Sequence, residues 1–138
     1  MNKGNKGLKR VIKGNQGYKK LIVWRNACEL RAFIYRLTRK FPKQELRRVS
    51  QMNDSARSIK QNIQEGYIRK SLAEYIHFLS IAQGSLNELF GDLEDCYVDG
   101  LISEDEFNYG EKLIGRTNYL FVRLIQALER RRKVYAKI

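Results

Sequence analysis

Apolar residues recur at spacings of three and four along most of this chain, the pattern of amphipathic helices that each bury one face. Four such segments follow one another. The first begins near Tyr18 and stops before Pro42, because the residue that precedes a proline is pushed out of the helical region. The expected core positions, segment by segment, are Trp24, Ala27, Leu30, Ile34, Leu37 and Phe41; Leu46, Val49, Met52, Ala56, Ile59 and Ile63; Leu72, Ile76, Leu79, Ala82, Leu86, Leu89, Leu93 and Cys96; and Phe107, Leu113, Thr117, Leu120, Leu124 and Leu128.

Local signals mark where the other three helices begin and end. Pro42 suits the first turn of the second helix, and Gly66 marks its end. Residues 71–74 and 103–106 both match the S-x-x-E capping box, which satisfies free N–H groups at the start of a helix. Gly100 suits the left-handed cap that ends the third helix.

Four helices of roughly 20 to 30 residues joined by short loops predict an all-α, antiparallel up-down-up-down four-helix bundle. We expect the bundle to span residues 18–133, between a flexible basic arm at 1–17 and a short C-terminal tail at 134–138. No apolar run approaches the roughly 20 residues that span a bilayer, and the N-terminus lacks the apolar block of a secretory signal. We therefore expect a cytoplasmic protein with no membrane partner.

Large apolar residues also occur outside the four stripes. They fit either a wide core whose tyrosine hydroxyls reach the surface or a second face buried by self-association, since aromatic residues are enriched at interfaces. We favour a homo-oligomer, because one bundle cannot easily turn so many aromatic rings inward. Gly84 supports it, since glycine inside a helix costs roughly 1 kcal/mol against alanine and lets another helix pack closely. These residues are Val23, Tyr35, Tyr67, Tyr75, Phe78, Ile81, Phe90, Tyr97, Tyr109, Tyr119, Phe121 and Val122.

The net charge of +12 lies at the two ends of the chain. Residues 1–20 carry seven basic side chains and residues 130–138 carry five, with no acidic side chain in either segment. The body between them is neutral but polarised: residues 21–70 hold 12 bases and 4 acids, whereas residues 71–129 hold 3 bases and 11 acids. This polarity can pair the two helical hairpins within one subunit or pair one subunit with the next, and the sequence leaves both open.

The chain offers little for catalysis or metal binding. His77 is the only histidine, and no serine or cysteine motif accompanies it, so we expect no enzyme. The two cysteines lie outside any CxxC or Cys/His cluster, so we expect neither zinc nor another cofactor. Asp92, Asp95 and Asp99 share a helix face that a divalent cation could use. Without a Glu-x-x-His element, we favour a solvated acidic face or partners for the basic helices.

The basic residues are the feature that indicates a function. Lysine runs often form only a solvated face, but these chain ends lack acids, and arginine, which binds phosphate through two hydrogen bonds, is well represented in the body. No zinc finger, RNA-recognition motif or helix-turn-helix is recognisable, so we expect non-specific contacts to the phosphate backbone. The candidate nucleic-acid-binding residues are Lys3, Lys6, Lys9, Arg10, Lys13, Lys19, Lys20, Arg25, Arg36, Arg39, Lys40, Arg47, Arg48, Arg57, Lys60, Arg69, Lys70, Arg130, Arg131, Arg132 and Lys133.

Several short runs occur in a distinctive order: Leu21-Ile-Val-Trp24, Ala27, Phe41-Pro42, Glu45-Leu46, Ser50-Gln51, Ala56-Arg57-Ser58-Ile59, Asn62-Ile63-x-Glu65-Gly66 and Phe78-Leu79-x-Ile81-Ala82-x-Gly84-Ser85-Leu86-x-Glu88-Leu89. Over roughly residues 18–130 this order resembles the four-helix-bundle family of 23S rRNA intervening-sequence proteins, also called the S23 ribosomal protein family. The resemblance implies a homopentameric ring of bundles whose basic surfaces bind nucleic acid, RNA more than DNA. Related proteins include the accessory variability determinants that partner reverse transcriptases in diversity-generating retroelements. The family often has an arginine just before its Ala-x-Ser-Ile run, where this chain has Asn53-Asp54-Ser55.

Two functions of different classes remain open. The first is an oligomer that binds RNA or DNA phosphates non-specifically, through the arm, the Arg130–Lys133 run and the basic first hairpin. The second is an adaptor whose main ligand is another protein, such as a reverse transcriptase, with nucleic acid as a co-ligand. A steep salt dependence of nucleic-acid binding distinguishes the first, and salt-resistant capture of one protein distinguishes the second.

Overall fold

The computed structural model describes residues 16–136, and all regular structure in this part of the chain is helical. The four long helices are α2 (Ile22–Thr38), α3 (Leu46–Tyr67), α4 (Leu72–Val98) and α5 (Glu104–Ala136). The 3-10 helix η2 (Gly17–Lys20) precedes α2, and a second one, η3 (Lys43–Glu45), precedes α3. The prediction of four helices and an all-α chain is confirmed for these residues. Of the arm expected at 1–17, residues 1–15 lie outside the described part.

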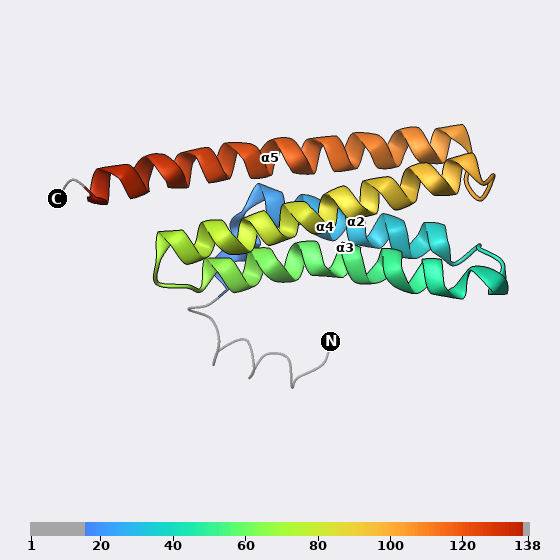
Figure 1. The fold of residues 1–138 in the computed structure, drawn as a ribbon, viewed down its shortest axis with the longest axis horizontal. Helices are drawn as coiled ribbons and strands as arrows, with labels where there is room; N and C mark the ends of the chain where they lie inside the picture. The colour runs from blue at the N-terminus through green and yellow to red at the C-terminus, as the bar shows by residue number, and fades with distance from the viewer. Residues whose placement is uncertain (1–15, 137–138) are drawn as a thin grey trace.

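The four helices lie side by side along the long axis of the molecule (Figure 1). α2 packs on α3 and α5, and α4 packs on the same two helices, so each helix has two neighbours around a common core. The α2–α3 and α4–α5 loops lie at one end of the molecule, and the α3–α4 loop lies at the other. α5 is the longest helix, and its last turns extend past the α3–α4 loop.

Most predicted core positions are buried, including every member of the α4 stripe from Ile76 to Cys96. Leu46 is an error of the prediction: it is 73% exposed, because it opens α3 at the end of the bundle, where Arg48 rather than an apolar side chain reaches α4. Val23 and Phe121, which the pattern places outside the core, are buried in it, Phe121 with 0% exposure. The face that α5 turns inward therefore lies one residue away from the predicted stripe around position 120.

The predicted helix boundaries follow from local hydrogen bonds. The Glu74 amide donates to Ser71 Oγ at 3.3 Å at the start of α4. At the start of α5 the capping box is reciprocal: the Glu106 amide donates to Ser103 Oγ at 3.1 Å, and the Ser103 amide donates to Glu106 Oε1 at 2.9 Å. Gly100 has a φ of 77°, the left-handed conformation expected of it. α5 continues to Ala136, three residues past the boundary expected at 133.

Candidate nucleic-acid interface

Basic side chains from the α3–α4 loop and from the last turns of α5 line one surface hollow, and η2 carries two more beside α2 and α3. Lys19 and Lys20 belong to η2, which packs on α3. Lys70 lies in the α3–α4 loop, and Arg131 and Arg132, from the last turns of α5, line the same surface hollow as Lys70. We call Lys70, Arg131 and Arg132 the basic end. These three residues are candidates from the sequence, and the fold brings them to one hollow.

Aromatic contacts hold η2 against α2 and α3. The Tyr18 ring packs edge-on against Trp24 and Tyr67, with ring centroids 5.3 and 6.4 Å apart. Trp24 Nε1 donates to Gln64 Oε1 at 3.1 Å, which ties the start of α2 to α3. Gly17 packs so closely on the Tyr67 ring that a Cβ would not fit. These contacts fix the point where the described chain begins beside the α3–α4 loop.

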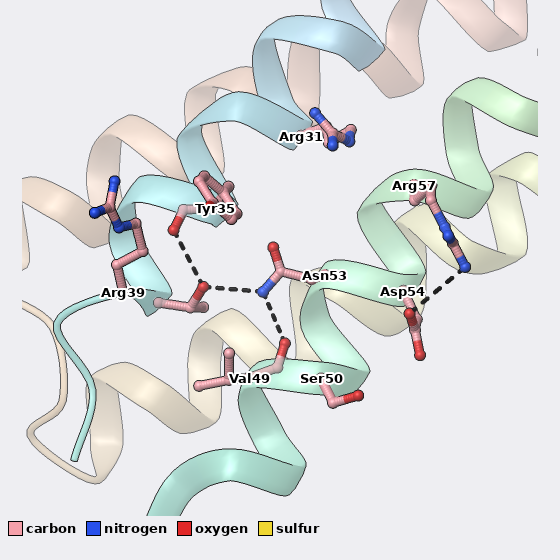
Figure 2. A pocket seen from close by; sticks show the side chains of 9 residues that line it. Arg31, Tyr35, Arg39, Val49, Ser50, Asn53, Asp54 and Arg57 are labelled. Carbon is pink, nitrogen blue, oxygen red and sulfur yellow. Dashed lines mark hydrogen bonds and ion pairs between the residues drawn. The ribbon is translucent and has the colours of Figure 1, made fainter. Parts of the chain in front are cut away.

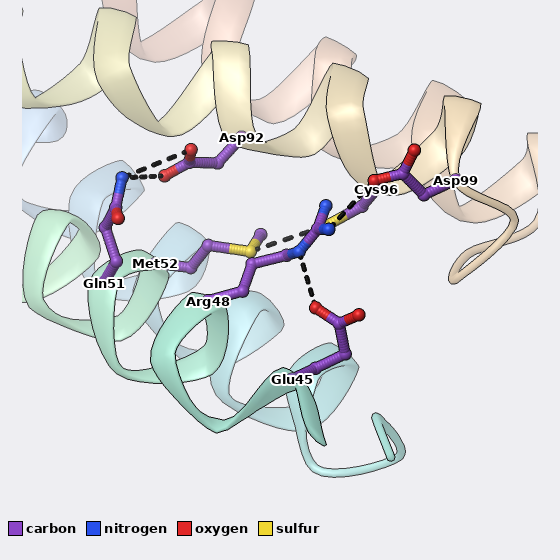
Figure 3. A network of polar contacts seen from close by, with 7 residues as sticks. All are labelled: Glu45, Arg48, Gln51, Met52, Asp92, Cys96 and Asp99. Atoms are coloured by element: carbon purple, nitrogen blue, oxygen red, sulfur yellow. Dashed lines mark hydrogen bonds and ion pairs between the residues drawn. The ribbon is translucent and has the colours of Figure 1, made fainter. Parts of the chain in front are cut away.

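At the opposite end of the molecule, acidic side chains pair with two of the candidate binding residues, Arg48 and Lys40. Figure 3 shows the acids around Arg48. Arg48 Nε donates to Glu45 at 2.8 Å, and Arg48 Nη2 donates to Asp99 at 2.8 Å. The hydrogen bond that Arg48 donates to Asp99 is the main reason that the pKa of Arg48 is raised above its ordinary value. Lys40 forms an ion pair with Glu106. Part of the opposite charge of the two hairpins is therefore paired within one subunit, through Arg48 and Lys40.

The late acids of α4 face partners on α3. Gln51 Nε2 donates to both carboxylate oxygens of Asp92, at 3.3 and 3.4 Å, and burial raises the pKa of Asp92. Cys96 Sγ lies 3.6 Å from Met52 Sδ, and burial raises the pKa of its thiol. Within residues 16–136, no group of three or more His, Cys, Asp and Glu side chains is arranged to hold a metal ion.

A cleft of about 390 Å³ opens between α2 and α3 (Figure 2). Three arginines line this α2–α3 cleft: Arg31 and Arg39 from α2, and Arg57 from α3. Arg31 is absent from the sequence candidates, although Arg31, Tyr35 and Arg39 are spaced by four residues and so share one helix face. Asn53 also lines the cleft, in the segment where the family often has an arginine. The positive charge of the cleft therefore comes from Arg31, Arg39 and Arg57 instead.

The other candidates are distributed over the surface. Several make local contacts: Arg25 Nε donates to the Lys19 carbonyl at 3.1 Å, Lys60 Nζ donates to Gln64 at 3.3 Å, and Arg69 pairs with Glu65 at 3.1 Å. The exposed remainder on the helices comprises Arg36, Arg47, Arg130 and Lys133. The arm candidates Lys3, Lys6, Lys9, Arg10 and Lys13 lie outside the described residues.

No helix within residues 16–136 is both long and apolar enough to cross a membrane.

Comparison with known proteins agrees with the order of motifs in the sequence. No curated protein sequence matches the chain. The family model described as 23S rRNA-intervening sequence protein matches residues 19–121, which include α2, α3, α4 and the first half of α5. The chain therefore belongs to the 23S rRNA-intervening sequence protein family.

Proposed function

We propose that this protein binds nucleic acid, RNA in preference to DNA, through the phosphate backbone and without catalysing a reaction. The basic end carries the proposal, because the α3–α4 loop and the last turns of α5, which are distant in sequence, bring Lys70, Arg131 and Arg132 to one hollow. Cations gathered in this way bind phosphates by releasing condensed counterions. The family description refers to 23S rRNA, which supports RNA as the first ligand to test.

We further infer that up-down-up-down bundles assemble into a homo-oligomer, with a pentamer as the first candidate. The exposed apolar residues Ile81 on α4 and Tyr119 and Val122 on α5 support a contact between subunits. The mass of the assembly, measured by light scattering after size exclusion, gives its subunit number directly.

Assembly matters for the mechanism, because each basic end is then one of several weak sites. Binding by one subunit places its neighbours at a high effective concentration relative to the same RNA, and avidity follows without a strong single site. A monomeric variant that bound RNA as tightly as the assembly would contradict this part of the proposal.

The proposal is tested by fluorescence anisotropy of a structured RNA and a matched duplex DNA, titrated with the full chain at stepped salt concentrations. One variant combines Lys70→Gln, Arg131→Gln and Arg132→Gln. The control combines Lys43→Gln, Lys112→Gln and Arg123→Gln, which removes the same charge from exposed positions that are not candidates for binding. Loss of three phosphate contacts lowers the slope of log K against log salt by roughly 2 to 3, because each contact contributes about 0.9 on a duplex.

The comparison between the two variants decides the outcome. We expect the basic-end variant to bind much more weakly than the control, with a flatter salt dependence. Equal losses would mean that net charge alone attracts the RNA, and absence of binding by the full chain at moderate salt would refute the proposed function.

A protein-binding adaptor is the second candidate, with a reverse transcriptase among its conceivable partners. The observation that favours it is apolar surface beside the basic end: Val134 and Tyr135 are 61% and 60% exposed and line a hollow with Arg130 and Arg131. Aromatic and arginine side chains together are typical of protein interfaces. Salt-resistant capture of one purified partner, lost in Val134→Ser with Tyr135→Ser, would support this function.

A further inference from the structure

We propose that the α2–α3 cleft holds one nucleotide of a single-stranded nucleic acid, with the phosphate between Arg31 and Arg57 and the base against Tyr35. This inference rests on the proposed function, since it names a site and a strandedness for the same class of ligand. The cleft lies on the side of two helices, and its residues are distinct from the basic end.

The charges that line the cleft favour an anion. Arg31, Arg39 and Arg57 contribute three positive charges against the single carboxylate of Asp54. Among the described residues neither Arg31 nor Arg39 forms an ion pair, so their charge is not balanced by a neighbouring acid. Arginine is suited to phosphate because its planar guanidinium can donate two parallel hydrogen bonds to it.

Asp54 is a weak competitor for that anion. Its carboxylate oxygen lies 3.8 Å from Arg57 Nη2, beyond hydrogen-bond distance, and both side chains are largely exposed. Figure 2 shows this pair along the outer flank of α3, with Arg57 turned toward Asp54. Exposed ion pairs contribute at most about 1 kcal/mol, so a phosphate with two hydrogen bonds can displace Asp54 from Arg57.

Tyr35 provides a surface for a base. Its side chain remains 53% exposed, and the guanidinium carbon of Arg39 lies 5.6 Å from the ring centroid. Unpaired bases stack both on tyrosine rings and on arginine planes, and each stacked base contributes roughly 1–3 kcal/mol. An aromatic ring beside three arginines therefore suits a nucleotide better than it suits a bare anion.

The amide of Asn53 adds an acceptor that a bare phosphate cannot use. Its Nδ2 donates to Thr38 Oγ1 at 2.9 Å and to the Val49 carbonyl at 2.8 Å, and these two bonds fix the orientation of the amide. The amide oxygen then points into the cleft, toward the side that holds Tyr35 and Arg31 (Figure 2). An oxygen in this position accepts from a base N–H or a ribose hydroxyl, groups that a nucleotide supplies.

These contacts require a single strand. In a duplex the base faces are stacked on their neighbours, so Tyr35 could not stack on one. The cleft volume of about 390 Å³ falls within the roughly 300–1,000 Å³ of small-molecule sites. Because Arg31, Tyr35 and Arg57 at its rim are exposed, the strand can pass across the cleft while one nucleotide enters it.

The test is anisotropy of a fluorescent single-stranded RNA of about ten nucleotides, and of a hairpin of the same composition, with the full chain. The cleft variants are Arg31→Gln, Arg57→Gln and Tyr35→Leu. Lys43→Gln and Lys112→Gln are matched controls, because each removes one exposed positive charge outside the cleft at a position that is not a candidate for binding. All five positions are exposed, so the fold should survive, and circular dichroism verifies it.

We expect Arg31→Gln and Arg57→Gln each to weaken binding of the single strand about 5- to 10-fold and to reduce its salt slope by about 0.7. The two controls should change it less than about 2-fold. Asp54→Asn should strengthen binding about 2- to 5-fold, because it frees Arg57 and removes the repulsion of the phosphate. Tyr35→Leu should weaken binding with an unchanged salt slope, since stacking involves no counterion release.

Several results would overturn the inference. Cleft variants that bind like their controls, or an Asp54→Asn that binds more weakly than the native chain, exclude a phosphate there. If the cleft variants lower the mass of the assembly in light scattering, the cleft is a contact between subunits. If they bind RNA normally while the basic-end variant does not, the inference alone fails; if the full chain binds no RNA, the proposed function fails with it.

Discussion

Alanine substitutions at Gly84 and Gly110 are expected to change the free energy of unfolding in opposite directions. Both glycines lie inside long helices, α4 and α5, where alanine is favoured over glycine by roughly 1 kcal/mol. A Cβ at Gly84 would meet no atom within 4 Å, so alanine gains the full helical preference there. At Gly110 the Cβ would stand 2.6 Å from Leu93 Cδ2 and 3.1 Å from Phe33 Cε2.

The structure sets the size of the effect at Gly110. Optimal separations between carbon atoms are about 3.5–4.0 Å, so both of these distances are repulsive. Leu93 is fully buried, and its tip cannot turn into solvent to make room. Overpacking a core in this way costs roughly 1–3 kcal/mol, and the helical preference offsets about 1 kcal/mol of it. We expect Gly84→Ala to raise the free energy of unfolding by about 1 kcal/mol. Gly110→Ala should be about 1–3 kcal/mol less stable than Gly84→Ala.

Urea denaturation followed by circular dichroism measures both changes. Gly115→Ala is a second control, since a Cβ there also meets open space. Equal stabilisation of Gly84→Ala and Gly110→Ala would refute the reasoning from packing. If Gly84→Ala destabilises the protein by an amount that depends on protein concentration, another subunit covers Gly84, and the measurement locates the contact between subunits.

Three further experiments probe the core, a helix cap and an ion pair between helices. Phe121→Ala should lower the free energy of unfolding by about 3–5 kcal/mol in urea denaturation, because the ring is fully buried. Glu106→Ala should cost about 0.5–2 kcal/mol at pH 7, since it removes a helix cap. Lys40 lowers the pKa of Glu106, so its carboxylate stabilises the fold above the unfolded-state pKa, and native and variant stabilities should approach one another as the pH falls through the lowered pKa. A double-mutant cycle of Arg48→Gln and Asp99→Asn should give a coupling of about 0.5–1 kcal/mol that falls with added salt.

The sequence predicts the helices well, because their start and stop signals act locally. The serines and glutamates of the two capping boxes need only their own first turn, and Gly100 needs only its own φ. The inward face of a helix is harder to predict where two apolar stripes run side by side. On α5, Leu120 and Leu124 form one stripe and Phe121 belongs to the next. Periodicity alone does not choose between them, since the choice depends on how α5 packs against α2 and α4.

The candidate interface is predictable only in part, for a related reason. The sequence identifies the basic segments, but their convergence depends on the length of α5, which carries Arg131 and Arg132 to the level of Lys70. It also misses Arg31, which stands on the polar side of α2 and is recognised only when α3 brings Arg57 opposite to it. The four-residue spacing from Arg31 through Tyr35 is the one signal in the sequence that could have found it.

Basic residues lie at both ends of the bundle, and the two groups differ in their acidic neighbours. Near the α2–α3 loop, Arg48 and Lys40 meet Asp99 and Glu106 of the α4–α5 hairpin, and their charge stabilises contacts between helices. Around the α3–α4 loop, Lys70, with Arg131 and Arg132, lines a hollow that contains no acid. Clustered cations repel one another and destabilise the free protein, and a bound polyanion relieves that repulsion. Paired charge thus stabilises the fold near the α2–α3 loop, and the unpaired charge around the α3–α4 loop is the part that we propose binds nucleic acid.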